Sequence, residues 1–118
     1  NRFFYKKNHE KESYIEPLYA FVPSIGINQI IGVPLEFSYF WKGDFLITSL
    51  NGRSIYRVTL NKDYNKVISM EKIFIGKRIR DIVYNDKKNI FVLALEGKKF
   101  SKSAEGIPSI GILRVSNN

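Results

Sequence analysis

Residues 43–60 read GDFLITSLNGRSIYRVTL, and this stretch decides the fold. Residues 44–50 form a nearly continuous apolar run of strand length, and residues 54–60 alternate apolar and polar side chains, as a half-exposed strand does. Between them, Asn51-Gly52 is a dipeptide that favours a tight hairpin turn because both residues tolerate a positive φ. The stretch therefore predicts an antiparallel hairpin.

The same pattern continues on both sides of this hairpin. Polar turns at residues 61–65 and 85–88 separate further runs of strand length, and no helical stripe is present. The additional predicted strands cover residues 25–33, 66–74, 78–84, 89–95 and 109–115, and residues 89–95 are apolar enough for a strand covered on both faces. The chain is therefore predicted to be all-β, built from two successive meanders.

The two meanders resemble each other. Residues 43–50 align with residues 88–95 at an offset of about 45, the length of one four-stranded propeller blade. We therefore expect about two four-stranded antiparallel blades of a β-propeller, with a polar linker at 1–15, a first blade and its preceding loop at 16–76, and a second blade, complete or not, at 77–118. Two blades leave edges and apolar faces bare, so the expected partners are the remaining blades of a parent protein or further copies of the chain.

Composition narrows the class of protein. The 118 residues carry a net charge of +8, 44% hydrophobic residues and no cysteine, which excludes a disulfide framework and thiolate metal sites. The basic residues are spread over predicted loops, which favours solvated lysines over a nucleic-acid surface. No apolar run is long enough for a membrane span. The first residues show neither an initiator Met nor a signal-peptide layout, so we expect the chain to come from a longer one.

The segment KRIRDIV, residues 77–83, places charges in a predicted strand. Strict alternation puts Arg78, Arg80 and Ile82 on one face, and Asp81 on the other face with its apolar neighbours. Two guanidiniums about 6.5 to 7 Å apart can clamp a planar ligand with several carboxylates, or phosphates. Alternatively, the arginines pair with carboxylates of neighbouring blades or reach solvent. A buried Asp81 would need a hydrogen-bonding partner and a structural role.

Four motifs, in order along residues 16–115, resemble the glucose/sorbosone dehydrogenase family, the soluble sugar dehydrogenases that use pyrroloquinoline quinone (PQQ). They are EPLYAFVPSI at 16–25, WKGDFLITSLNG at 41–52, YRV at 56–58, and RIRDI at 78–82 followed by NIFVLAL at 89–95. The resemblance implies a six-bladed propeller of which this chain is the C-terminal part. It also implies that the parent protein is an oxidoreductase acting on an aldose, glucose or sorbosone-type sugar, in the periplasm or secreted.

The resemblance also assigns candidate cofactor-binding residues. Arg78 and Arg80 match the arginines that help hold the carboxylates and ring oxygens of the quinone in the family. Leu50 and Asn51 match a strand tip where some members place a lysine, and Phe21 matches an aromatic residue that lines the site. The chain departs from the family pattern at Ile27-Asn28, where many members have Pro-Ser, and at residues 87–89, where many have a turn Asp-Gly.

In the family, a histidine acts as general base and calcium polarises the quinone, and both sites lie in earlier blades. The only histidine of this chain, His9, lies in a polar segment, and Asp44, Asp63 and Asp86 lack the spacing of a calcium loop. We therefore expect no catalytic residue and no metal site in this chain, which alone is expected to be inactive. Two alternatives stay open: a non-catalytic propeller-type binding or scaffold protein, and a basic nucleic-acid-binding β-domain.

Overall fold

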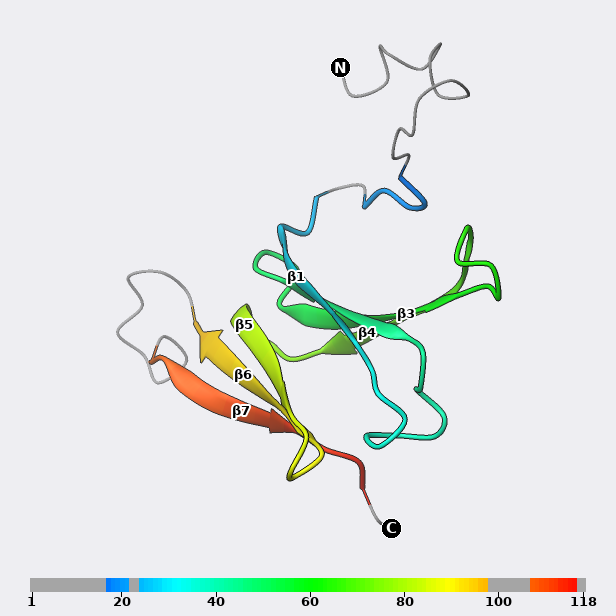
Figure 1. Cartoon of the computed structure of the whole chain (residues 1–118). Helices are drawn as coiled ribbons and strands as arrows, with labels where there is room; N and C mark the ends of the chain where they lie inside the picture. The colour runs from blue at the N-terminus through cyan, green and yellow to red at the C-terminus, as the bar shows by residue number, and fades with distance from the viewer. Residues whose placement is uncertain (1–16, 22–23, 98–106, 117–118) are drawn as a thin grey trace, which may run out of the picture.

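The computed structural model describes residues 17–21, 24–97 and 107–116, and all the regular elements in these ranges are β-strands (Figure 1). The strands are β1 Ile27–Gly32, β2 Phe45–Ser49, β3 Ser54–Leu60, β4 Val67–Phe74, β5 Arg78–Asn85, β6 Ile90–Glu96 and β7 Ser109–Leu113. The prediction of an all-β chain and the seven predicted strand positions are confirmed. The linker proposed for residues 1–15 lies outside the described residues.

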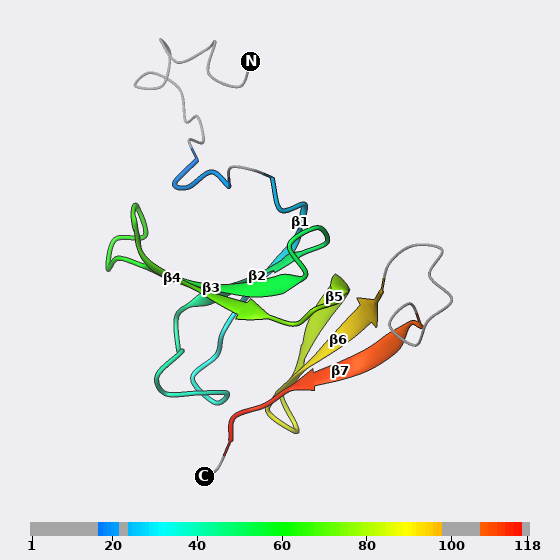
Figure 2. The ribbon, with the colours of Figure 1, turned by 180° about the vertical axis from the view of Figure 1, so that it is seen from behind.

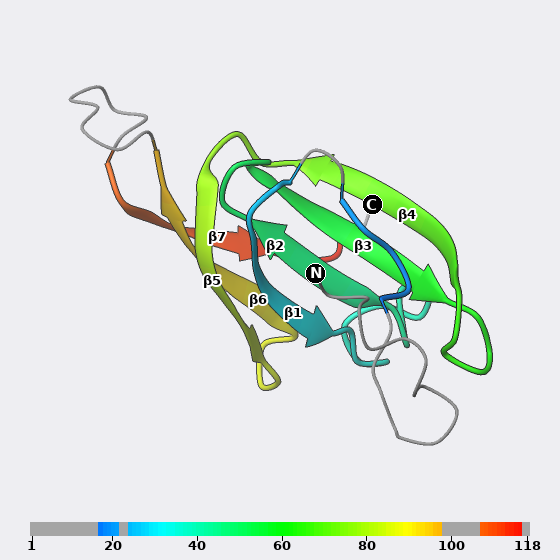
Figure 3. The ribbon, with the colours of Figure 1, turned by 90° about the horizontal axis from the view of Figure 1, so that it is seen from above.

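The strands form two antiparallel sheets in which each strand pairs with its neighbour in the sequence. The first sheet has the order β1-β2-β3-β4 and the second the order β5-β6-β7 (Figure 2). Within the described residues the second sheet therefore has three strands, one fewer than a complete four-stranded blade. Seen from above, β5 runs beside β1, so the first strands of the two sheets are neighbours (Figure 3).

The hydrophobic core lies between the two sheets. Leu46 and Ile55 contribute from the first sheet, and Ile79, Ile82 and Phe91 from the second; all are almost completely buried. The other members of the core are Val33, Phe37 and Leu93. Alternation along each strand sends these side chains toward the opposite sheet and leaves a second face of each sheet pointing away from the core.

The second sheet exposes apolar side chains on its outer face. Ile110 is 77% exposed, and Val83 and Ile112 beside it are about half exposed. Within this chain residues 89–95 are covered on one face only, because Ala94 is exposed and Val92 only half-buried, so the prediction of a strand covered on both faces is not met by the described residues alone. One face of β6 packs against the first sheet, and no described residue covers the other.

Candidate functional site

The strand that carries both candidate arginines begins with a β-bulge. Ile79 pairs with Leu95 and Asp81 with Ala94, so Arg80 is an extra residue without a cross-strand partner. The extra residue reverses the alternation, and for this reason Ile79 and Ile82 are both buried. The predicted grouping is wrong in two respects: Ile82 does not share a face with the arginines, and Asp81 is exposed on their side of the strand.

Two side chains of β1 bind the backbone of this bulge. The amide nitrogen of Asn28 donates hydrogen bonds to the carbonyl oxygens of Ile79, at 3.3 Å, and of Arg80. The amide oxygen of Gln29 accepts a hydrogen bond from the backbone N–H of Ile82 at 3.0 Å. The polar groups that the bulge removes from the ladder thus find partners on the first sheet. The sequence did not identify either residue as part of the site. The only signal was the departure from Pro-Ser at residues 27–28, which includes Asn28 but not Gln29.

The two arginines differ in their partners. The Nε of Arg80 donates to Oε2 of Glu96 at 2.5 Å, so its charge is neutralised at the surface. Arg78 is half-buried, and its Nε is buried without a hydrogen-bond acceptor. Glu96 lies directly opposite Arg78 in the ladder yet pairs with Arg80. Among the residues that the structure describes, Arg78 therefore has a positive charge with no carboxylate paired to it.

The connection between β2 and β3 holds Leu50 and Asn51. Their backbone N–H groups donate to the carbonyl oxygens of Gly26, at 2.9 Å, and Ile25, at 3.0 Å, which fixes the connection to the segment before β1. Gly26 has a φ of +66°, and a Cβ there would lie 3.1 Å from the amide nitrogen of Asn51. The side chain of Asn51 is exposed. Leu50 and Asn51 are thus bonded to the two residues that directly precede β1, the strand whose side chains bind the bulge of β5.

The predicted Asn51-Gly52 two-residue turn is wrong. Four residues, 50–53, connect β2 to β3, and the residue with positive φ is Arg53, at +50°. Gly52 is required for space instead, because an added Cβ would lie 2.6 Å from Oγ of Ser49 and 3.0 Å from the hydroxyl of Tyr56. The glycine lets the connection lie flat against these two hydroxyls.

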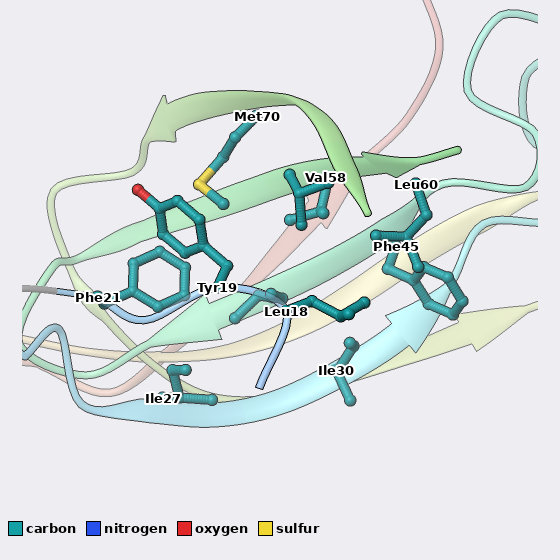
Figure 4. Close-up of a pocket in the computed structure, with 11 residues that line it drawn as sticks. Leu18, Tyr19, Phe21, Ile27, Ile30, Phe45, Val58, Leu60 and Met70 are labelled. Carbon is teal, nitrogen blue, oxygen red and sulfur yellow. The ribbon is translucent and has the colours of Figure 1, made fainter. Parts of the chain in front are cut away.

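Phe21 lies on a different side of the molecule from the arginines. Its ring contacts the rings of Tyr19 and Tyr56 edge to face, with centroids 5.0 and 5.3 Å apart. It lines an apolar hollow of about 270 Å³ over the outer face of the first sheet, with Ile30 and Met70 (Figure 4). By strand alternation, this face points away from the second sheet. The structure therefore brings Arg78 and Arg80 together and places Phe21 apart from them.

A third arginine, Arg57, has a structural environment. Its guanidinium contacts Asp44 at 2.6 Å and Glu71 at 2.9 Å, and it lies over the ring of Trp41 at 4.9 Å. Burial acts to lower the pKa of Arg57, but the hydrogen bonds that its guanidinium donates to Glu71 and Asp44 outweigh it and raise the pKa above its ordinary value. Asp44 is nearly fully buried, so this network ties the start of β2 to β3 and β4.

No cluster of three or more acidic or histidine side chains that could bind a metal ion occurs in the described ranges, and His9 lies outside them. The described residues also contain no helix with the length and apolarity needed to cross a membrane.

The model of the family described as Glucose / Sorbosone dehydrogenase matches residues 3–100, most of the chain. No curated protein matches the sequence.

Proposed function

The chain belongs to the glucose/sorbosone dehydrogenase family, and we propose that it is the C-terminal portion of a PQQ-dependent sugar dehydrogenase and contributes arginine side chains to the quinone site. In this proposal the parent protein is an oxidoreductase acting on an aldose, glucose or sorbosone-type sugar. Family membership supports the reaction class, and the geometry of β5 supports the role of the arginines.

The observation that carries the proposal is the environment of Arg78. A buried guanidinium nitrogen without an acceptor costs free energy, unless a ligand supplies the missing oxygen. The cofactor PQQ is a planar molecule with several carboxylates, and charge-assisted hydrogen bonds from arginine suit carboxylates. Arg78 therefore fits the role of a cofactor-binding residue.

The other candidate residues fit this role to different degrees. Arg80 lies on the same side of β5 as Arg78 but would have to share its guanidinium between Glu96 and the cofactor. Asn51 is exposed and can donate a hydrogen bond without adding charge, and Leu50 offers apolar contact beside it. Phe21 is the weakest candidate, because its ring lies over the outer face of the first sheet.

The residues that perform the chemistry lie elsewhere in this proposal. When bound, PQQ supplies the acceptor for a hydride from the anomeric carbon of the sugar. The histidine base and the calcium ligands would come from preceding blades, and the described part of this chain would only bind and orient the cofactor. A periplasmic or secreted location is part of the same proposal.

The bare apolar faces support the presence of further blades. The outer face of the second sheet exposes Val83, Ile110 and Ile112, and the outer face of the first sheet exposes Ile27 and Ile30. Faces of this kind are stable in water only when another layer covers them. We propose that blades of the parent protein cover both faces; self-association of the chain is the alternative for the isolated chain.

A specific observation favours a second candidate function, a non-catalytic propeller-type binding or scaffold protein. Glu96 neutralises Arg80, and Asn51 stands where some family members place a lysine. Both features lower the positive charge available to an anionic cofactor.

Calorimetric titration of PQQ into the chain, at low and moderate salt, tests the proposal. We expect the wild-type chain to bind and Arg78→Ala to bind about ten-fold more weakly, since it removes one charge-assisted contact. The double variant Arg78→Ala/Arg80→Ala should not bind. Arg114→Ala is the matched control, because it removes an exposed arginine after the far end of β7.

Equal affinity of the wild type and a folded Arg78→Ala variant would contradict the role of Arg78. A folded wild-type chain that binds no PQQ, while the complete parent protein does, would show that the site needs the other blades. Absence of binding by the parent as well would favour the non-catalytic function.

A further inference from the structure

The loop between β1 and β2, residues 34–43, exposes large apolar side chains. Phe40 is 87% exposed, Tyr39 67% and Leu35 55%. The rings of Tyr39 and Phe40 contact each other edge to face, with centroids 5.8 Å apart. A single exposed apolar side chain is common on protein surfaces, but three large ones on one short loop form the kind of exposed apolar group that marks an interaction site.

The base of this loop is firmly fixed, so only its tip projects. Phe37 is buried and its ring lies 4.7 Å from that of Phe91 in the core. Trp41 stacks under the guanidinium of Arg57, and its backbone N–H donates to Oγ of Ser38. Backbone hydrogen bonds between Val33 and residues 43–44 close the loop. Tyr39 and Phe40 are therefore presented by a rigid support, which lowers the entropic cost of binding.

Basic residues lie on the segments at this end of the molecule. The loop, the β5–β6 turn and the chain after β7 lie at the same end of the molecule (Figures 1 and 2). A hollow of about 390 Å³ joins them, lined by Glu36, Phe37, Lys88, Asn89, Ile90, Arg114 and Val115. Lys42 lies over the ring of Tyr39, at 4.2 Å from its centroid. We call this surface the aromatic-basic face: Leu35, Tyr39, Phe40, Lys42, Lys87, Lys88 and Arg114.

The charges of this face are unbalanced. Its four cations, Lys42, Lys87, Lys88 and Arg114, are exposed, and the acidic residues of the same three segments are Glu36 and Asp86. Cations beside exposed aromatic rings are the composition of surfaces that bind anionic bilayers, where the rings enter the headgroup region and the cations stay outside.

We propose that the aromatic-basic face binds an anionic lipid surface, with Phe40 and Tyr39 entering the headgroup region and the four cations facing the lipid phosphates and carboxylates. The rings stand on a projecting loop, which suits insertion into a deformable layer. The hollow beside them is lined mainly by polar and charged groups, so it does not offer the apolar pocket in which a protein partner would place its own aromatic anchor.

This binding would leave the arginine site accessible. Arg78 and the β5–β6 turn are at opposite ends of β5, which has eight residues. At the usual rise per residue, they are separated by roughly 20 Å or more. The proposal therefore does not depend on the proposed quinone site, and either can fail without the other.

Co-sedimentation of the full chain with vesicles tests it. The vesicles are pure phosphatidylcholine, or phosphatidylcholine with about one quarter phosphatidylserine, at low and at high salt. We expect binding to the anionic vesicles only, weakened by salt, and reduced about ten-fold by Phe40→Ser, which removes the apolar ring. The double variant Lys87→Gln/Lys88→Gln should bind about ten-fold more weakly than wild type.

Phe74→Ser is the matched control. Phe74 is 70% exposed at the end of β4, where it pairs with Ser54, so the change removes another largely exposed phenyl ring outside the aromatic-basic face. Its binding should equal that of the wild type. Trp41, the single tryptophan, provides a second readout, because lipid brominated in the upper acyl chain should quench its fluorescence in wild type and not in Phe40→Ser.

The proposal would be overturned by no binding to anionic vesicles, by equal binding of wild type and Phe40→Ser, or by an equal loss in Phe74→Ser. The last would show general apolar adhesion. Equal binding to neutral vesicles would overturn the role of the four cations.

Discussion

The regions around Arg57 and Arg78 contain the same kind of side chain in opposite environments. In the first sheet, the guanidinium of Arg57 contacts two carboxylates and the ring of Trp41. In the second sheet, the Nε of Arg78 is buried with no acceptor among the described residues, while the nearby Glu96 pairs with Arg80. Both arginines are partly buried and both lie on strands, so burial alone does not distinguish them.

The difference separates structural charge from charge available to a ligand. A structural arginine such as Arg57 has its donors paired and its charge neutralised, and removing it leaves the buried carboxylate of Asp44 without its partner. A ligand-binding arginine has unpaired donors in the free protein, which lowers the stability of the free protein, and these donors gain acceptors when the ligand binds. Three substitutions test this distinction.

The largest effect is expected for Arg57→Ala. The change leaves the carboxylate of Asp44 buried without a partner, and we expect a loss of about 3 kcal/mol in the free energy of unfolding. Urea denaturation followed by circular dichroism measures this loss. Lys62→Ala, an exposed cation in the β3–β4 turn, is the control and should change stability by less than about 0.5 kcal/mol. If Arg57→Ala also lost less than about 0.5 kcal/mol, Arg57 would not be a structural arginine, and the contrast with Arg78 would fail.

An intermediate effect is expected for Asn28→Ala. This variant leaves the carbonyl groups at the bulge of β5 without their donor, which should lower the free energy of unfolding by about 1 to 2 kcal/mol. It should also loosen the backbone that carries Arg78 and Arg80. The control is Asn65→Ala, since Asn65 bonds only within an exposed turn. Faster hydrogen exchange at β5 in Asn28→Ala, with β3 unchanged, would locate the effect. Equal losses in both variants would argue against a link between the sheets through Asn28.

The smallest effect is expected for Arg78→Leu. Removing a buried donor without an acceptor should leave the free energy of unfolding unchanged or raise it by up to about 1 kcal/mol, unlike the change at Arg57. The same urea titration measures it. A loss of 2 kcal/mol or more would assign Arg78 a structural role and would contradict the proposed quinone contact.

Most of the fold could be predicted from the sequence because alternation and turn residues are local signals. The strands around residues 45–60 follow directly from the pattern of apolar side chains. The details that failed depend on tertiary contacts. The bulge at Arg80 needs the amides of Asn28 and Gln29 on another strand, about 50 positions away in the sequence. The shape of the β2–β3 connection depends on the hydroxyls of Ser49 and Tyr56 next to Gly52.

The candidate site was only partly predictable for the same reason. The spacing placed Arg78 and Arg80 two positions apart on one predicted strand, but it gave no sign that Arg80 is the extra residue of a bulge at which the register shifts. No sequence pattern shows that Glu96 pairs with Arg80 rather than with Arg78, which lies directly opposite Glu96 and has no carboxylate partner in the described part of the chain. The family motif named Phe21 as a residue that lines the same site as the arginines. In the structure its ring lies over the outer face of the first sheet, which points away from the second sheet and its arginines.

The order of the strands has a consequence for how the chain folds. Each strand pairs with the one that precedes or follows it in the sequence, so both sheets can form by closing short loops. The bonds from Asn28 to β5 join residues up to 52 positions apart, and they can form only when two separate sheets meet. We therefore expect early hairpin formation within each sheet and a later, slower step in which the sheets dock and the bulge acquires its partners.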